Sequence, residues 1–153
     1  MSNEEMESKI EQICEELGIT LVWIQADRNC ANRAQRGVWV KHIADSGDFA
    51  VALHEIGHTQ CDPDNRPPNE REQLDAETSA WEWALRRNND AFDAKGWKRL
   101  HESLRQYYNG ASDTDHPARR LLEEAETQNA DIPRRVTHFA TQIYLGRKKK
   151  TSL

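Results

Sequence analysis

The chain has 153 residues, a net charge of −5 and 31% charged side chains, so we expect one soluble domain and no direct binding of nucleic acid. The longest apolar run is too short to span a bilayer, and the first residues lack the basic and apolar segments of a signal peptide. Because the three cysteines include no CxxC pair, we expect no disulfide framework and a cytoplasmic protein.

The first third of the chain predicts a helix followed by a small sheet. Apolar residues three or four apart indicate a helix over residues 4–17, which Gly18 ends. Two runs rich in β-branched and aromatic residues, 19–25 and 37–43, indicate a buried strand and a second strand. The polar stretch between them, 26–36, is either a loop or a weak third element. We therefore expect two or three strands.

The middle of the chain is predicted to be helical. A helix over 47–60, with Asp45 or Ser46 as its N-cap, ends before two consecutive prolines. Two further helices are expected over 69–87 and 93–108, because apolar residues in each recur at helical spacing.

The last part of the chain follows a linker of small and polar residues, NGASDTDHP. Two shorter helices are expected over 117–128 and 133–145. The linker divides the chain into a core over residues 1–109 and a helical appendage over 110–153. The chain ends in a basic run, 147–150, which we expect to be solvated, the alternative being a contact with nucleic acid or an acidic partner.

The sequence HEIGH matches the pattern H-E-x-x-H at His54, Glu55 and His58. Histidines four apart on a helix share one face, so both imidazoles can reach one tetrahedral metal ion such as zinc. The alternative is a polar helix with solvated histidines. Apolar residues on the opposite side favour an enclosed helix, in which buried histidines need partners. The pattern therefore indicates a metal site.

A third ligand is expected on the helix over 69–87. Glu77 falls within an apolar stripe that contains Leu74 and Trp81, and a carboxylate there is costly unless it is paired or bound to metal. One alternative is a buried ion pair between Glu77 and an arginine. Another is Cys61 as the ligand, near the same face as His58, which would indicate a closed structural site.

Three protein ligands, His54, His58 and Glu77, would leave a fourth position on zinc for water. A metal ion there lowers the pKa of that water and polarises a substrate carbonyl. Glu55 is placed to take the proton of the water as general base and to deliver it to the leaving amine. The expected reaction is peptide-bond hydrolysis without a covalent intermediate.

Two features bear on how a peptide would be held. His101, Tyr107 and Tyr108 follow on the next helix, and each is a candidate to stabilise the developing oxyanion. The sequence distinguishes none of them. The strand over 37–43 enters the motif helix through a short turn. If it lies at the edge of the sheet, an extended peptide could pair with it as an added strand.

Two phrases, GDFAVALHEIGH and LDAETSAWEWAL, together resemble the ImmA/IrrE-like zinc metallopeptidases of bacteria, phages and mobile elements. His54, Glu55 and His58 match the first motif of that family, and Glu77 matches its glutamate ligand. The resemblance covers about residues 4–86. The family more usually continues with Ala-Asn-x-Phe-Ala after the glutamate, whereas this chain has Thr-Ser-Ala-Trp-Glu, closer to a tryptophan-containing, phage-like variant.

The resemblance implies an α+β fold: a mostly helical, zincin-like domain with a small sheet packed on the HExxH helix. It also implies a gluzincin-type endopeptidase that often cleaves a transcriptional repressor encoded beside it. No helix-turn-helix is evident, so any link to DNA would run through a repressor-like substrate. The alternatives are a zinc-binding regulatory or interaction protein with little turnover, and a small helical binding protein with an accidental motif.

Overall fold

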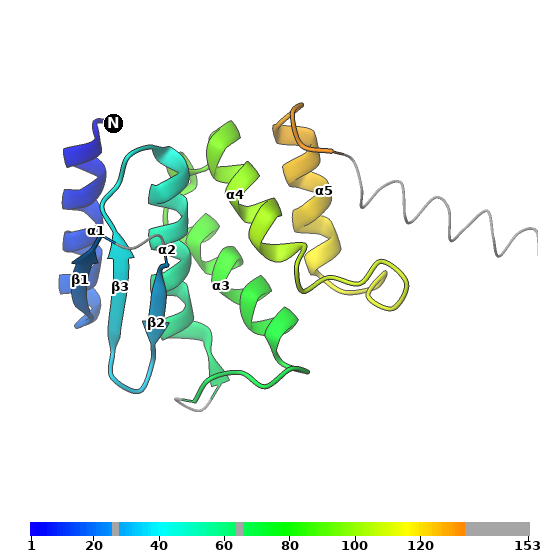
Figure 1. Ribbon diagram of the computed structural model, residues 1–153, viewed down its shortest axis with the longest axis horizontal. Coiled ribbons are helices and arrows are strands. Elements are labelled where there is room, and N and C mark those ends of the chain that lie inside the picture. The colour runs from blue at the N-terminus through cyan, green and yellow to red at the C-terminus, as the bar shows by residue number, and fades with distance from the viewer. Residues whose placement is uncertain (26–27, 64–65, 134–153) are drawn as a thin grey trace, which may run out of the picture.

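The structure is a computed structural model that describes residues 1–25, 28–63 and 66–133. Over these residues the fold is α+β, with five α-helices, a short 3₁₀ helix and a three-stranded mixed sheet (Figure 1). In chain order the elements are α1 (Asn3–Leu17), β1 (Thr20–Ile24), β2 (Cys30–Asn32), β3 (Gly37–Lys41), α2 (Ser46–Cys61), α3 (Gln73–Arg87), η2 (Asn89–Ala91), α4 (Ala94–Leu104) and α5 (Ala118–Gln128).

The strand order is β1–β3–β2, so β3 lies in the centre of the sheet. Trp39 of β3 pairs with Val22 of the parallel strand β1 and with Cys30 of the antiparallel strand β2. The hypothesis that the strand over 37–43 accepts a peptide at the sheet edge is therefore wrong, because both of its sides are already paired. The edges belong to β1 and β2, and β2 is the edge strand that contacts α2.

Within the described residues, helices leave one face of the sheet open and cover the other. Val38 and Val40 are buried on that face, beneath α1 and α2. Val22 is 37% exposed, and Trp39 is half-buried on the open face. The sequence predicts a buried strand over 19–25, but β1 alternates between exposed and half-buried residues. An edge strand with one open face cannot bury all of its side chains.

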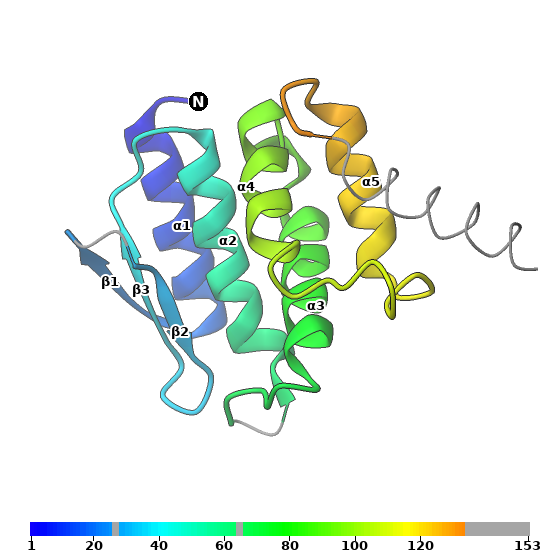
Figure 2. The same ribbon diagram turned by 45° about the vertical axis from the view of Figure 1, so that its right-hand side comes forward.

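The helices form successive layers beside the sheet (Figure 2). α1 and α2 lie next to the strands, α3 and α4 pack against α2, and α5 packs against α4. The motif helix α2 is thus enclosed between the sheet and two other helices, with Phe49, Leu53 and Ile56 fully buried. The same hydrophobic core continues into α5 through Leu122 and Ala125.

The helix ends have clear local causes. Ser2 and Glu5 form a capping box at the start of α1, and Gly18 adopts the left-handed conformation that ends it. Of the two N-cap candidates for α2, Asp45 is the cap, and its side chain accepts from the backbone N–H of Asp48 at 2.9 Å. Each cap satisfies backbone groups that a helix end leaves without partners.

Two helices are shorter than the periodicity predicts. α3 begins at Gln73 rather than at 69, because Asn69 forms a turn with Glu72 after the prolines. α4 ends at Leu104 rather than at 108, and the chain continues in single hydrogen-bonded turns. The expected helix over 133–145 and the basic run over 147–150 lie outside the described residues, apart from Pro133.

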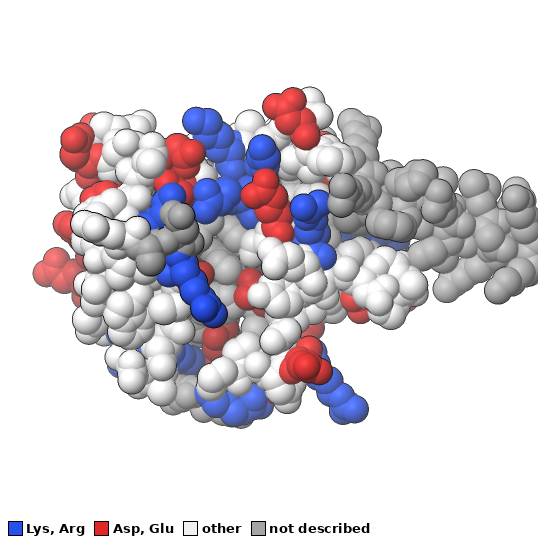
Figure 3. All heavy atoms as spheres, viewed as in Figure 1, with Lys and Arg blue, Asp and Glu red and all other residues white. Residues whose placement is uncertain are grey.

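Charge is distributed unevenly over the surface. Exposed acidic side chains gather over α1 (Figure 3), and they are Glu4, Glu5, Glu11, Glu15 and Glu16.

The three cysteines are free thiols. None of the helices in the described ranges is long and apolar enough to cross a membrane.

Candidate metal centre

The candidate site lies beside a close contact between α2 and α3. A Cβ atom placed on Gly57 would lie 2.6 Å from the carbonyl oxygen of Ala80, a distance that no ordinary side chain tolerates. Glycine therefore permits the close contact between the two backbones. This contact lets the side chain of Glu77 reach the histidines of α2.

His54, His58 and Glu77 converge at this contact. The Nε2 atom of His54 lies 2.7 Å from one carboxylate oxygen of Glu77, and the Nε2 atom of His58 lies 3.2 Å from the other. One possible ligand atom from each residue lies within 4.8 Å of the others, and among the described residues this is the one group of three or more such side chains that could hold a metal ion. The three residues predicted as ligands are thus brought together.

The structure supports neither of the two alternatives that the sequence left open for the third ligand. The charged partners of the Glu77 carboxylate are the two histidines rather than an arginine, and Cys61 does not belong to the metal-binding group. The neighbouring acid Asp75 points to solvent with 72% of its side chain exposed and pairs with His116 at 2.6 Å. The site therefore contains two nitrogen donors and one carboxylate, with no thiolate.

Asp62 is a site residue that the sequence did not single out. Its Oδ1 atom accepts a hydrogen bond from Nδ1 of His58 at 2.7 Å. The proton on Nδ1 is therefore fixed, and Nε2 is left to face Glu77 and any metal ion. Carboxylates that hold metal-ligating histidines in this way orient the ring and raise its basicity. The only signal in the sequence is that Asp62 follows His58 by one helical turn.

Trp81 is the second residue whose role the sequence missed. Its indole stacks on the imidazole of His54, with ring centroids 4.1 Å apart and an interplanar angle of 12°. Trp81 is fully buried and contacts Phe92 edge-on. Helical spacing identified it as part of an apolar stripe, but the stack depends on how α2 and α3 cross.

The charges of the site are strongly coupled. Burial acts to raise the pKa of Glu77, but hydrogen bonds from His54 and His58 outweigh it and lower the pKa to about 2. Burial acts to lower the pKa of His58, but hydrogen bonds to Asp62 and Glu77 outweigh it and raise the pKa to about 10. Without metal, the site thus holds an imidazolium between two carboxylates.

Glu55, the predicted base, lies beside the candidate ligands and does not belong to their group. Its Oε1 atom is 3.7 Å from Nδ1 of His54, and its side chain is 13% exposed. Burial raises its pKa, the nearby charges of Glu77 and Asp62 act in the same direction, and the histidines act against it. A carboxylate with a raised pKa is a stronger base than an exposed one, which suits proton transfer near neutral pH.

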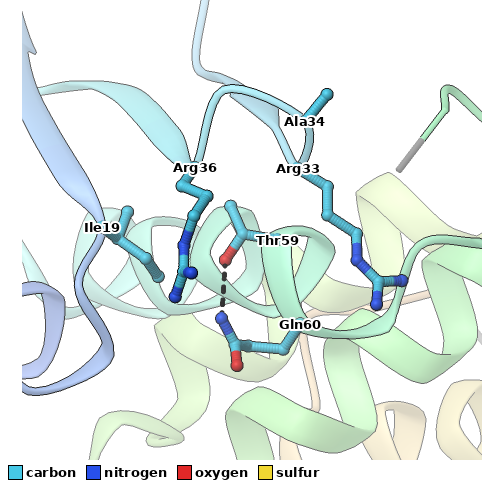
Figure 4. A pocket seen from close by; sticks show the side chains of 6 residues that line it. All are labelled: Ile19, Arg33, Ala34, Arg36, Thr59 and Gln60. Atoms are coloured by element: carbon cyan, nitrogen blue, oxygen red, sulfur yellow. Dashed lines mark hydrogen bonds between the residues drawn. The ribbon is translucent and has the colours of Figure 1, made fainter. Parts of the chain in front are cut away.

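A separate cavity of about 330 Å³ lies near the ends of α1 and α2 and contains none of the candidate ligands. Figure 4 shows Arg33 and Arg36 extending into it from the turn between β2 and β3, above Thr59 and Gln60. Arg36 donates to the carbonyl oxygen of Leu17 at 3.0 Å, in the last turn of α1. Positive charge at the C-terminal ends of two helices is stabilising, so we interpret these arginines as structural.

Comparisons of the chain with protein-family models, curated proteins and solved structures found no match. The resemblance to the ImmA/IrrE-like peptidases therefore stays a prediction. The geometry itself establishes a buried group of two imidazoles and one carboxylate that could bind a metal ion.

Proposed function

We propose that this protein is a zinc-dependent endopeptidase of the gluzincin type that hydrolyses a peptide bond in a specific protein partner. One observation carries the proposal: the Nε2 atoms of His54 and His58 and the carboxylate of Glu77 converge, with Glu55 beside them. Two imidazoles and one carboxylate are a donor set typical of catalytic zinc, which keeps its fourth position open.

The residues present fit a zinc ion chemically. Asp62 holds the Nδ1 proton of His58, so removal of the other proton leaves the Nε2 lone pair facing the site. The pKa of Glu77, lowered to about 2, keeps that carboxylate ionised at neutral pH. No thiolate is present in the group to close the fourth position. These are the properties that an open, three-ligand site requires.

The reaction follows from the position of Glu55. When bound, zinc supplies a Lewis acid that polarises a peptide carbonyl and acidifies water. Glu55 takes a proton from the attacking water and passes it to the nitrogen of the leaving amine. Its enclosed position limits competing contact with bulk solvent. Trp81 and Asp62 act earlier, because they hold His54 and His58 in place before a substrate arrives.

The fold also suggests how a peptide reaches the site. β2 is an edge strand and contacts α2, so an extended segment of a partner protein can add to its free side. Such pairing recognises backbone, whereas side-chain contacts would decide which partner is cut. The resemblance favours a repressor-like DNA-binding protein as that partner.

The proposal is tested by metal analysis and by Glu55→Gln. The purified protein should contain about one zinc ion per chain. Glu55→Gln should retain the zinc yet lose about 10²- to 10⁴-fold in cleavage rate, measured by mass spectrometry of new termini in the product of the adjacent gene or in a peptide library. Glu82→Gln is the matched control and should retain full rate, because Glu82 is a half-buried acid on α3 that pairs with Arg86 outside the candidate ligand group.

The two negative results of these tests lead to different conclusions about the protein. A preparation that binds no stoichiometric zinc under metal-replete conditions would contradict the metal centre itself. If the protein binds zinc and the Glu55→Gln variant keeps the biological effect of the parent, the protein would instead be a zinc-binding regulatory protein with little turnover.

A further inference from the structure

Peptide hydrolysis places negative charge on the carbonyl oxygen of the bond being cut, and a hydrogen-bond donor aimed at that oxygen accelerates the reaction. Three side chains near the end of α4 are candidates by sequence: His101, Tyr107 and Tyr108. The structure places them in different directions, which allows a choice.

His101 faces away from the metal centre. It is 2% exposed, and its Nε2 atom lies 3.5 Å from a carboxylate oxygen of Glu126 on α5. A side chain enclosed between α4 and α5 cannot reach a substrate held over α2. His101 is therefore part of the helix packing.

Tyr108 also faces α5. Its half-buried ring packs against the hydrophobic core. Burial raises the pKa of its phenol, and the charges that act on it are those of Arg119, Asp113 and Glu123, which belong to α5 and the segment before it. No residue of the metal centre acts on Tyr108.

Tyr107 lies on the other side. α4 lies beside α2 and runs in the same direction (Figure 2). The first turns of the two helices touch, since a Cβ atom on Gly47 would lie 3.5 Å from the carbonyl oxygen of Lys95, and one on Gly96 would lie 3.5 Å from Cβ of Ala50. α4 ends at Leu104 and Tyr107 follows in the next turn, so Tyr107 lies toward the same end of the two helices as His58, in the last turn of α2.

The surroundings of Tyr107 agree with this position. Its backbone N–H bonds to the carbonyl oxygen of Leu104, which holds it in a tight turn at the end of α4. The residue is 37% exposed, so Tyr107 is not enclosed in the core. Partial burial raises the pKa of its phenol, and the charges of Glu77 and Glu55 raise it further. These two carboxylates belong to the metal centre.

We infer that Tyr107 is a catalytic residue that donates a hydrogen bond from its phenol to the carbonyl oxygen of the scissile peptide bond. The inference rests on the proposed peptidase function. The water oxygen adds to the carbonyl carbon, and the π electron pair moves onto the carbonyl oxygen, where Tyr107 stabilises it. The pair then re-forms the C=O bond as the C–N bond breaks, and the nitrogen takes the proton held by Glu55. The phenol keeps its own proton throughout.

The test compares Tyr107→Phe with Tyr108→Phe, because the two substitutions remove the same atom from adjacent residues with opposite orientations. Acetohydroxamate is the probe, since its carbonyl oxygen occupies the place of the substrate oxygen while the molecule chelates the metal. Its dissociation constant is read from the visible spectrum of the cobalt-substituted protein, and metal content and melting temperature are measured beside it.

We expect Tyr107→Phe to bind the probe about ten- to a hundredfold more weakly at unchanged metal content, and Tyr108→Phe to bind it like the parent. On a cleaved peptide, Tyr107→Phe should lower kcat with little change in KM. Equal probe affinity in all three proteins, or no binding to the parent, would overturn the role of Tyr107. A Tyr107-dependent probe affinity without any peptide cleavage would place the phenol beside the metal centre but overturn its catalytic role together with the endopeptidase proposal, whereas cleavage that is equally fast in Tyr107→Phe would overturn the role of Tyr107 alone.

Discussion

The imidazole of His54 meets the carboxylate of Glu77 at its Nε2 edge, at 2.7 Å, and stacks face to face on the indole of Trp81, with ring centroids 4.1 Å apart. Glu77 and Trp81 are one turn apart on α3. The same helix therefore supplies both a candidate metal ligand, Glu77, and the ring that stacks on the neighbouring candidate ligand, His54. Trp81 is fully buried and cannot move aside without disturbing the core. The ring of His54 is therefore held before any metal binds.

Trp81→Phe should weaken zinc binding about tenfold, because a smaller ring leaves His54 free to tilt. It should also lower the free energy of unfolding by about 1–3 kcal/mol through the space it leaves. Trp97→Phe is the matched control, since Trp97 is buried and contacts Phe92 but has no ring contact with His54. Competition with a chromophoric chelator measures the affinity; an equal loss in both variants would show that the effect is general destabilisation.

Asp62→Asn should reduce zinc affinity about ten- to a hundredfold, because a neutral amide no longer raises the basicity of His58. The chain offers a close control in Asp75→Asn. Asp75 also pairs with a histidine, His116, at 2.6 Å, but its side chain is 72% exposed and lies outside the ligand group. Its replacement should leave zinc affinity unchanged. A similar affinity for both variants and the parent would remove Asp62 from the site.

Gly57→Ala should destabilise the protein and weaken zinc binding together. In an open helix this change stabilises by about 0.5–1 kcal/mol, but here the new methyl carbon would lie 2.6 Å from the carbonyl oxygen of Ala80 and force α2 away from α3. Gly47→Ala, where the nearest atom is a side-chain carbon of Arg99 at 3.0 Å, should cost much less. Thermal melts with and without zinc measure both effects. An equal or higher melting temperature for Gly57→Ala would refute the close contact.

Zinc binding should release about one proton near neutral pH and should strengthen as pH rises. In the metal-free protein the pKa of His58 is raised to about 10, so its Nε2 atom carries a proton that the metal must displace. Glu77, with its pKa lowered to about 2, is already ionised and releases none. The affinity should therefore rise about tenfold per pH unit below the pKa of His58.

Calorimetry in buffers of different ionisation enthalpy counts the released protons directly. A zinc affinity that stays constant between about pH 6 and about pH 8 would contradict the imidazolium assigned to His58. Asp62→Asn should flatten the pH dependence in part, since it removes one of the two carboxylates that hold the proton.

The ligand group could be predicted from the sequence because its signals are local. His54 and His58 are joined by helical spacing alone, and Glu77 stands out because a carboxylate interrupts an apolar stripe. The convergence of these residues needs only that two consecutive helices pack against each other through their apolar faces. Periodicity is the strongest signal that a single sequence carries.

The missed features depend on tertiary arrangement. Strand order cannot be read from composition, so the sequence could not show that β3 lies between β1 and β2. Asp62 gives no hydrophobic signal, and its role depends on the rotamer of His58. Tyr107 and Tyr108 are adjacent and chemically identical, and only the path of α4 beside α2 separates them.

The position of the ligands along the chain has a consequence for folding. Glu77 follows its partner His54 by 23 residues, whereas the ion pair that holds α4 to α2, Asp48 with Arg99, spans 51 residues. Contacts between near neighbours in sequence form with the smaller loss of chain entropy. Under the proposed function, the contact between α2 and α3 that joins the candidate ligands would therefore form at a smaller entropic cost than the contact between α4 and α2 that places Tyr107 beside them.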